Sequence, residues 1–401
     1  MNEVMQDSTT IPRPRAPEVT ALLVPVVLAL LWSAAALIAG VAWSLGAPGY
    51  PSPPAAFDVH TPMELIPPEV GAPIVAVVAG IGVLVAGWLL VGARLAARAG
   101  APPPSPFVPS VYAVALTVTA SVAAVDARLM GWVGYVLSVA FPPMPPGTLV
   151  QLIALLGALL WVAAAASWAR RRRLLSASAA ARPRVTNGRP VGRSAMIATW
   201  VAVVIPLLYA ATRLVWVAGV PFGISDALLR EGQESGLWWR GGGLALVAIG
   251  AAALTSGLVL RWGEVLPKWV PALGGRSVPV LLAVIPGLAA SFVVFGGGVT
   301  FVRVVAAGDL PLSEHLVTVG PALLWPIWGF ALAFATVAYH RRRTGRGHAT
   351  GRPRTGLPRT GLPRAGRLRT AQPMGTPQPP HPAMPARPSV EAEAQLSEQA
   401  R

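Results

Sequence analysis

Ile205–Gly223 reads IPLLYAATRLVWVAGVPFG, an apolar run whose only charged residue is Arg213. A helix that crosses the hydrocarbon core of a bilayer needs about 20 consecutive, mostly apolar residues. This run therefore predicts a membrane-spanning helix. A charged side chain at membrane depth is costly, so it usually faces the protein interior or extends to the lipid headgroups. The direction that Arg213 takes depends on how the other spans are organised.

The composition of the whole chain is that of a membrane protein. Of its 401 residues, 54% are hydrophobic and 12% are charged, whereas soluble domains carry about 25% charged residues. Cysteine is absent, which excludes disulfides, thiolate metal sites and cysteine nucleophiles. The formal net charge is +16, and in a membrane protein its distribution over the loops is more informative than its sum.

Eight segments are long and apolar enough to span a bilayer, and they predict an all-α, polytopic transmembrane helical bundle. These segments are Thr20–Leu45, Pro73–Ala93, Phe107–Val125, Thr148–Trp168, Ala195–Val220, Gly242–Leu260, Val278–Val302 and Leu316–Tyr339. The apolar stretch 130–141 is shorter, and a proline-rich stretch follows it. We interpret it as an interfacial or re-entrant segment and not as a ninth span.

The distribution of arginine predicts the orientation of the bundle. If the N-terminus is cytoplasmic, most of the 32 basic residues fall on the cytoplasmic side, as the positive-inside rule requires. They include the clusters Arg170–Arg173 and Arg341–Arg343, which follow the fourth and eighth spans. Both termini are then cytoplasmic, and we expect a multi-pass protein of the bacterial plasma membrane that contacts the lipid bilayer.

The eight spans divide into two halves of four. Each half begins with a proline-containing span and ends with a tryptophan-containing helix and an arginine cluster. Because four is an even number, the halves would share one orientation, as parallel repeats do; a general likeness among apolar helices is the alternative. We expect a cytoplasmic tail (1–19), the first half (20–173), a basic cytoplasmic linker (174–194), the second half (195–343) and a disordered Arg/Pro-rich cytoplasmic tail (344–401).

The familiar catalytic motifs are absent from the sequence. It contains no Gly-x-x-x-x-Gly-Lys phosphate loop, no His-Glu-x-x-His zinc helix and no nucleophile elbow. We therefore expect no enzyme activity, no cofactor and no metal.

Two predicted outer loops contain a histidine close to carboxylates. Their residues are Asp58, His60, Glu64 and Glu69 in the first loop, and Asp309, Glu314 and His315 in the second. A histidine between carboxylates can bind a metal or relay protons. The spacing fits no defined metal site, and the alternative is that both loops are solvated.

Four charged residues lie within or next to the spans, towards the predicted outer face. They are Asp126, Arg128, Arg213 and Arg303. Because ionisable residues at depth often mark solute pathways, we hypothesise that they line an outward-facing polar vestibule for an anionic or zwitterionic solute, with Asp126 paired to one arginine. For Arg213 the alternative is a structural pair, or snorkelling to the outer headgroups beside Trp216.

The inner segment RWGEVLPKWVPALGGRSVP (Arg261–Pro279) combines basic and tryptophan side chains, which suits contact with lipid headgroups. The candidate contacts are Arg261, Trp262, Lys268, Trp269 and Arg276; a plain interfacial connector is the alternative. Together with YAATRLVWVAGVPFG (Tyr209–Gly223), this segment resembles strings in uncharacterised polytopic membrane proteins of high-GC actinobacteria. The resemblance covers roughly the second half of the chain. It implies a location in the inner membrane and no catalytic or binding residue.

Two functions are compatible with these features. The first is a transporter-like membrane protein whose solute contacts the predicted vestibule. The second is a non-enzymatic membrane scaffold or sensor that acts through its basic cytoplasmic tail, which could bind an anionic lipid or an acidic partner. Nucleic acid is a further possible partner of this tail, and we expect it less than these two. The solute and the oligomeric state are not predicted.

Overall fold

The computed structural model describes residues 20–53, 60–139, 141–177, 191–268, 274–310 and 312–345. These residues all belong to one of the two compact units of the chain. The predicted N-terminal tail, most of the basic linker and the tail from residue 346 lie outside the described residues, as do Asp58 and Trp269.

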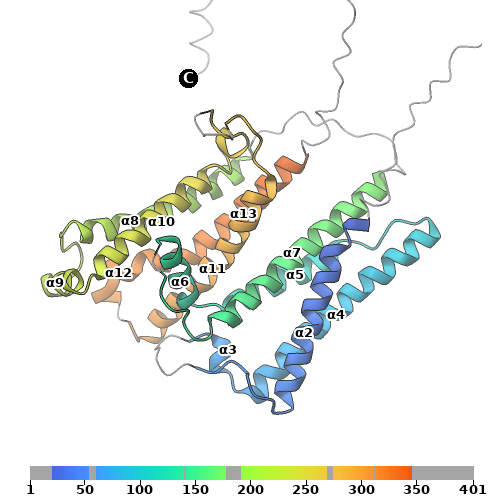
Figure 1. Ribbon diagram of the computed structural model, residues 1–401, viewed down its shortest axis with the longest axis horizontal. Coiled ribbons are helices and arrows are strands. Elements are labelled where there is room, and N and C mark those ends of the chain that lie inside the picture. Colours follow the sequence, from blue (N-terminus) through green and yellow to red (C-terminus); the bar gives the residue numbers. More distant parts are fainter. Residues whose placement is uncertain are drawn as a thin grey trace, which may run out of the picture. The chain divides into compact units, whose positions relative to one another are not determined.

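The described part of the chain contains eight spans that are long and apolar enough to cross a bilayer, and it contains no β-strand. The protein is therefore an all-α, multi-pass membrane protein, which confirms the prediction (Figure 1). Seven spans are single helices: α2 (Val24–Ser44), α4 (Pro68–Ala99), α5 (Phe107–Ala124), α7 (Thr148–Ala177), α8 (Arg193–Val217), α10 (Leu237–Ser256) and α11 (Val280–Ala307). The eighth comprises α12 (Leu312–Leu323) and α13 (Trp325–Gly345).

Four shorter helices connect the spans: α3 (Pro62–Leu65), α6 (Ala127–Leu137), α9 (Asp226–Glu234) and the 3-10 turn η1 (Arg261–Gly263). Helix α6 covers most of the stretch that we interpreted as interfacial or re-entrant. Its 11 residues extend about 16 Å at a rise of ~1.5 Å per residue, which is too short for a hydrocarbon core of ~30 Å. It is not a ninth span.

The last span is broken at Leu324, between α12 and α13. Pro326 follows in the first turn of α13. Proline has no amide hydrogen, and its ring clashes with the carbonyl four residues earlier in a continuous helix. The break therefore lies next to Pro326, which cannot donate the backbone hydrogen bond that a continuous helix needs there.

The helices of the two halves pack in the same order. In the first half α2 packs against α4 and α7, and α7 packs against α5. In the second half α8 packs against α10 and α13, and α13 packs against α11. The short helices also correspond, because α3 and α9 precede the second span of their halves whereas α6 and α12 precede α7 and α13. Three main pairings of spans thus correspond between the two halves.

Helix α11 joins the second half to the first by packing against α5, α6 and α7 (Figure 1). The Ser121 hydroxyl of α5 donates a hydrogen bond of 3.0 Å to the carbonyl of Phe292 on α11. Around this contact Val125, Leu129 and Val293 form a small buried cluster with Phe292.

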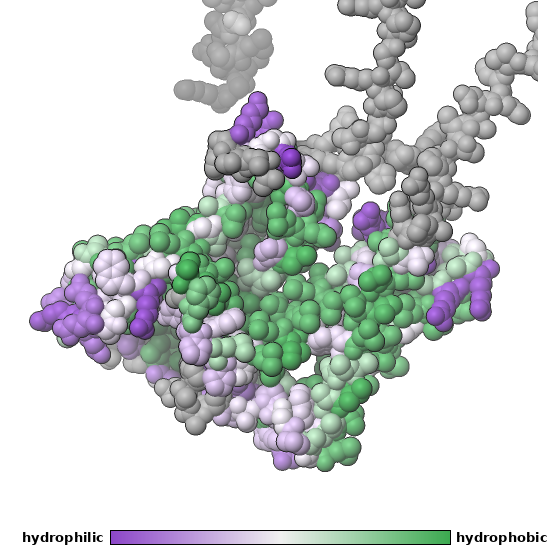
Figure 2. Space-filling view, viewed as in Figure 1, coloured by the Kyte–Doolittle hydropathy of each residue, from purple (hydrophilic) through white to green (hydrophobic). Residues whose placement is uncertain are grey.

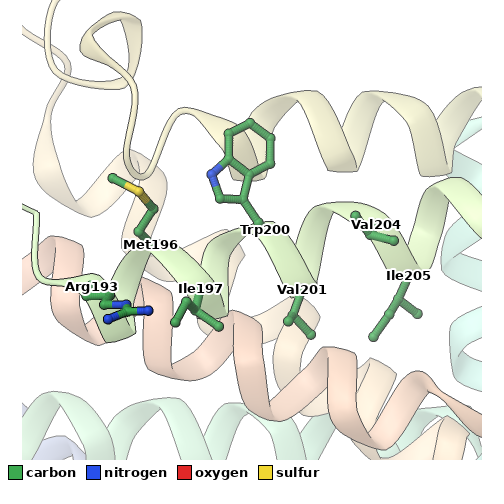
Figure 3. A pocket seen from close by; sticks show the side chains of 7 residues that line it. All are labelled: Arg193, Met196, Ile197, Trp200, Val201, Val204 and Ile205. Carbon is green, nitrogen blue, oxygen red and sulfur yellow. The ribbon is translucent and has the colours of Figure 1, made fainter. Parts of the chain in front are cut away.

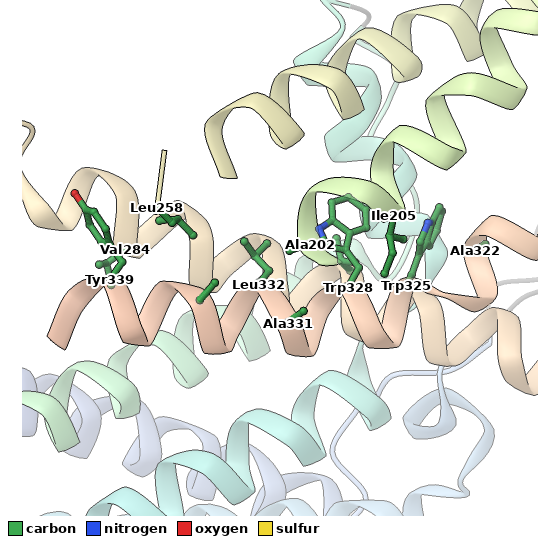
Figure 4. Packing of buried hydrophobic residues seen from close by; sticks show 12 residues of the cluster. Ala202, Ile205, Leu258, Val284, Ala322, Trp325, Trp328, Ala331, Leu332 and Tyr339 are labelled. Atoms are coloured by element: carbon green, nitrogen blue, oxygen red, sulfur yellow. The ribbon is translucent and has the colours of Figure 1, made fainter. Parts of the chain in front are cut away.

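The core of the second half lies along one face of α13. Trp325, Trp328, Leu332 and Tyr339 are buried there, and Figure 4 shows them in one row, with Ile205 of α8 near the tryptophans. Their spacing of three, four and seven residues places them on one stripe of a helix. This stripe is the surface that α8 and α11 cover.

Large apolar side chains are exposed over the outside of the spans. Leu84 is 73% exposed, Ile38 71% and Phe330 69%, and Figure 2 shows apolar residues over much of the visible helical surface. Soluble proteins rarely expose apolar patches of this extent. The bilayer is therefore the solvent of these faces.

Glycines allow α11 and α13 to approach closely. A Cβ atom on Gly329 of α13 would lie 2.8 Å from both the backbone nitrogen of Phe295 and the backbone oxygen of Ser291 on α11. Small residues at such crossings let membrane helices pack without a hydrophobic driving force. By contrast, a Cβ on Gly87 of α4 would meet nothing within 4 Å.

We expect Gly329→Ala to lower the free energy of unfolding by about 1–3 kcal/mol, the usual cost of overpacking. The backbone of α11 cannot yield as a flexible side chain would. Thermal unfolding of the detergent-purified protein measures the effect, and Gly87→Ala is the matched control that should keep the wild-type Tm. Equal Tm values for both variants would show that α11 and α13 do not pack as closely as described.

Candidate functional site

Asp126 occupies the junction where α5 ends and α6 begins. The backbone of Val125 and Asp126 is extended, which turns the chain out of α5. The Asp126 carboxylate then caps α6, because its Oδ1 accepts a 2.8 Å hydrogen bond from the backbone N–H of Arg128. Asp126 is fully buried, so the cap also places a negative charge inside the protein.

Arg128 joins two carboxylates from different parts of the chain. Its Nε donates to Asp126 Oδ2 at 2.6 Å, and its Nη2 lies 2.5 Å from both Asp126 Oδ2 and Glu64 Oε2. Its Nη1 donates to the carbonyl of Pro146 at 3.3 Å. The side chains of Arg128 and Glu64 are 4% and 3% exposed, so these ion pairs are shielded from water.

Glu64 is held in place by a capping box. Its Oε2 accepts a 2.9 Å hydrogen bond from the backbone N–H of Thr61, whose hydroxyl accepts a 3.2 Å bond from the N–H of Glu64. Such reciprocal bonds satisfy two free amide donors at a helix start. Pro62 begins α3, where its missing amide hydrogen costs nothing. The four-residue helix α3 thereby presents the carboxylate of Glu64 to Arg128.

Gln151, in the first turns of α7, completes the site. Its Nε2 donates to Asp126 Oδ1 at 3.0 Å, and its Oε1 accepts from the backbone N–H of Asp126 at 3.2 Å. The buried hydroxyl of Thr148 lies one turn earlier and has no hydrogen-bond partner among the described residues. We call Thr61, Glu64, Asp126, Arg128 and Gln151 the Arg128 network. It connects α3, α6 and α7.

Gly147 is required where the chain passes the Arg128 network. Its φ of +79° lies in the left-handed region, which residues with a Cβ rarely adopt. A Cβ there would also lie 2.6 Å from Glu64 Oε1. The turn before α7 can therefore come this close to the carboxylate of Glu64 only if position 147 is a glycine.

The Arg128 network carries two carboxylates and one guanidinium, a formal charge of −1 when all are ionised. Burial by itself lowers the pKa of Arg128, but the hydrogen bonds and charges of Asp126 and Glu64 outweigh this effect and raise the pKa above its ordinary value. The two carboxylates therefore favour the protonated guanidinium. The described residues contain no group of three or more His, Asp or Glu that could hold a metal.

Arg213 contacts side chains of its own helix, α8, and donates a hydrogen bond to α12. Its guanidinium carbon lies 4.4 Å from the ring centre of Tyr209 and 4.6 Å from that of Trp216. Nη1 donates to the Thr212 hydroxyl at 3.1 Å and Nη2 to the carbonyl of Thr318 at 3.3 Å. The rings and a carbonyl, and no carboxylate, therefore accommodate this charge.

The structure brings together two of the four predicted vestibule residues, Asp126 and Arg128. Sequence reasoning had placed Glu64 in an outer loop and had not paired it with Arg128; Gln151 carried no signal at all. Arg213 contacts α12, and Arg303 near the end of α11 is half-buried and forms no hydrogen bond or ion pair with a described residue. The carboxylate of Asp126 is satisfied by Arg128 and Gln151.

The inner segment between α10 and α11 folds back onto α13. Its two ends meet at an isolated antiparallel β-bridge between Val265 and Ser277, and the N–H of Leu266 donates to the carbonyl of Arg276 at 3.0 Å. The predicted headgroup residues Arg261, Lys268 and Arg276 are exposed, and Trp262 is half-buried. Exposure leaves the three basic side chains accessible to headgroups.

Three side chains of α13 hold this inner segment. The Tyr339 hydroxyl donates to the carbonyl of Gly263 at 2.7 Å. Arg342 donates to the carbonyl of Leu258 at 2.6 Å and pairs with Glu264 at 3.3 Å, while Arg343 donates to the carbonyl of Val278 at 2.9 Å. Two arginines of the cluster that follows the eighth span thus hold this segment against α13.

A lateral groove of about 650 Å³ runs along the first half of α8. Figure 3 shows Met196, Ile197, Trp200 and Val204 along it, with Arg193 at one end. A second groove of about 400 Å³ lies against α2 and α4 and has Arg94 among its lining residues. Both are lined almost wholly by apolar side chains on lipid-facing helices, so they suit acyl chains better than a polar solute.

No protein-family model, curated protein or solved structure matches this chain. The function is therefore inferred from the geometry of the site.

We expect Arg128→Gln to lower the free energy of unfolding by about 3–5 kcal/mol, because it leaves two buried carboxylates without a counter-ion. Adding Glu64→Gln to this variant should restore part of the loss, since one uncompensated charge is removed. Thermal or denaturant unfolding in detergent measures both.

Arg230→Gln provides the control, since Arg230 is exposed on α9 and its replacement should change stability by no more than about 0.5 kcal/mol. A double variant that is less stable than Arg128→Gln alone would contradict the role of Glu64 as a partner of Arg128.

Proposed function

We propose that this multi-pass membrane protein is a transporter-like protein of a bacterial plasma membrane. The Arg128 network acts as an ion-pair latch at the end of the bundle that the arginine distribution predicts to be outside. Its solute is a small anion or zwitterion. The observation that carries the proposal is the burial of one guanidinium between two carboxylates from separate segments.

The chemistry of the latch favours a solute that carries a carboxylate. Arg128 holds Glu64 through Nη2, whereas it holds Asp126 through Nε and Nη2 together. A solute carboxylate can replace Glu64 on the guanidinium without removing Asp126. Because α3 has four residues and is anchored by Thr61, release of Glu64 frees a small element and leaves the spans in place.

The shared packing order of the two halves also supports transport. Many secondary transporters consist of repeated halves, and their substrate sites lie near broken helices at the interface of the repeats. Here α11 packs against the first half, and the span formed by α12 and α13 is broken at Leu324. In this proposal Asp126 and Arg128 bind each other because the latch is closed.

Swelling of proteoliposomes, followed by light scattering, tests the proposal with succinate, glutamate, glycine and glucose as probes. We expect at least one of the three charged probes to enter faster than into protein-free liposomes, with glucose excluded. Glu64→Gln weakens the latch and should raise that rate severalfold.

Glu69→Gln is the matched control, because Glu69 is exposed at the start of α4 close to Glu64 in sequence, and it should keep the wild-type rate. Rates equal to those of empty liposomes for every probe, in both the wild type and Glu64→Gln, would refute the transport function. The scaffold or sensor alternative depends on the tail from residue 346, which lies outside the described residues.

A further inference from the structure

Helices α7 and α13 end in the same way in their respective halves. The Trp168 Nε1 donates to the carbonyl of Pro104 at 3.1 Å, and the Tyr339 hydroxyl donates to that of Gly263 at 2.7 Å. Each acceptor lies between the second and third spans of its half. Three residues later an arginine follows in each helix, and its guanidinium carbon lies 5.6 Å from the aromatic ring: Arg171 over Trp168 and Arg342 over Tyr339.

The two arginines differ in what satisfies their charge. Arg342 pairs with Glu264 and donates to the carbonyl of Leu258 through Nη2, which leaves its Nε buried without a hydrogen-bond partner among the described residues. Arg171 is 8% exposed, and its Nε and Nη1 are buried without a hydrogen-bond partner among the described residues. The segment that corresponds to the Glu264 loop is GAPPPSP (Gly100–Pro106), which contains no acidic residue. The first half thus lacks the carboxylate that the second half provides.

Further positive charge lies at this end of the bundle. Arg170, Arg173 and Arg341 are close enough to act electrostatically on His340, whose Nδ1 is buried without a described hydrogen-bond partner. Leaving a buried charge without a partner costs several kcal/mol. An anion that binds Arg171 would remove this cost and would be attracted by its cationic neighbours.

The position of Arg171 indicates where the anion comes from. It lies 23 residues after the first residue of α7, about 35 Å along the helix at ~1.5 Å per residue, whereas the hydrocarbon core is ~30 Å thick. Arg171 therefore lies at headgroup level, at the end of α7 where α13 also ends (Figure 1). Guanidinium groups bind phosphate oxygens with two parallel hydrogen bonds.

We propose that the ends of α7 and α13 form a binding site for the phosphodiester group of an anionic phospholipid, with Arg171 as the direct contact. Nε and one Nη of Arg171 donate to the phosphate oxygens, and Arg170 and Arg341 contribute long-range attraction. The phosphate takes the place that Glu264 occupies beside Arg342. This site is independent of the Arg128 network, which lies at the opposite end of α7.

Titration of the delipidated protein in detergent with dioleoyl phosphatidylglycerol tests the site, with Tm as the readout of binding. We expect phosphatidylglycerol to raise Tm, and Arg171→Gln to weaken its apparent Kd about tenfold, since a hydrogen bond to a charged group contributes about 1.5–3 kcal/mol. Inorganic phosphate at equal ionic strength should give no shift, and phosphatidylcholine a smaller one. An equal shift with inorganic phosphate would assign the site to a free anion and overturn the lipid proposal.

Two further variants keep the test decisive if Arg171→Gln does not fold. The exposed pair Arg170→Gln and Arg341→Gln should together weaken the Kd severalfold. Arg342→Gln is the matched control, because Arg342 follows Tyr339 in α13 as Arg171 follows Trp168 in α7. This variant should lower the basal Tm and leave the Kd for phosphatidylglycerol unchanged. A wild-type Kd in both Arg171→Gln and the double variant, or an equal loss in Arg342→Gln, would overturn the proposal.

Discussion

The absence of water from the hydrocarbon core is the constraint on which this structure depends. A backbone amide or carbonyl without a partner costs several kcal/mol there, so a chain crosses as helices that satisfy their own hydrogen bonds. The same condition explains why large side chains such as Leu84 are exposed on the spans, since lipid and not water surrounds them. It also means that each charged side chain near the spans needs a partner inside the protein or access to the headgroups.

The charges of the described arginines are stabilised by different kinds of partner, and these differences point to the two sites that we propose, at Arg128 and at Arg171. Arg128 is held between two buried carboxylates. Arg213 lies against two aromatic rings and donates to a carbonyl of α12. Arg342 has Glu264 and a loop carbonyl, whereas Arg171 has no partner for two of its nitrogens among the described residues. Because proteins avoid buried unpaired charges, Arg171 is the arginine for which we propose an anionic ligand.

The likeness between the two halves is what distinguishes Arg171 from Arg342. The main pairings of the spans follow the same order in both halves. Near the end of the last helix of each half, an aromatic side chain donates a hydrogen bond to a loop carbonyl, and an arginine lies over its ring. Equivalent positions can then be compared within one chain. The halves differ at opposite ends of the bundle: the first half contains the Arg128 network near the start of α7, and the second contains the carboxylate Glu264 that the first lacks.

The sequence by itself determined the eight spans, the all-α class and the shortness of the segment before α7. Hydropathy and length decide which segments enter lipid, and both are local properties of the chain. Only the tertiary structure decided which charges meet. Glu64 and Arg128 are 64 residues apart, and the contact depends on a capping box in α3 and a left-handed glycine before α7. It also decided that Arg213 turns to α12 and not to Asp126. Apolar helices have similar surfaces on every side, so their sequences do not specify how they pack, and the pairing of their few charges follows from that packing.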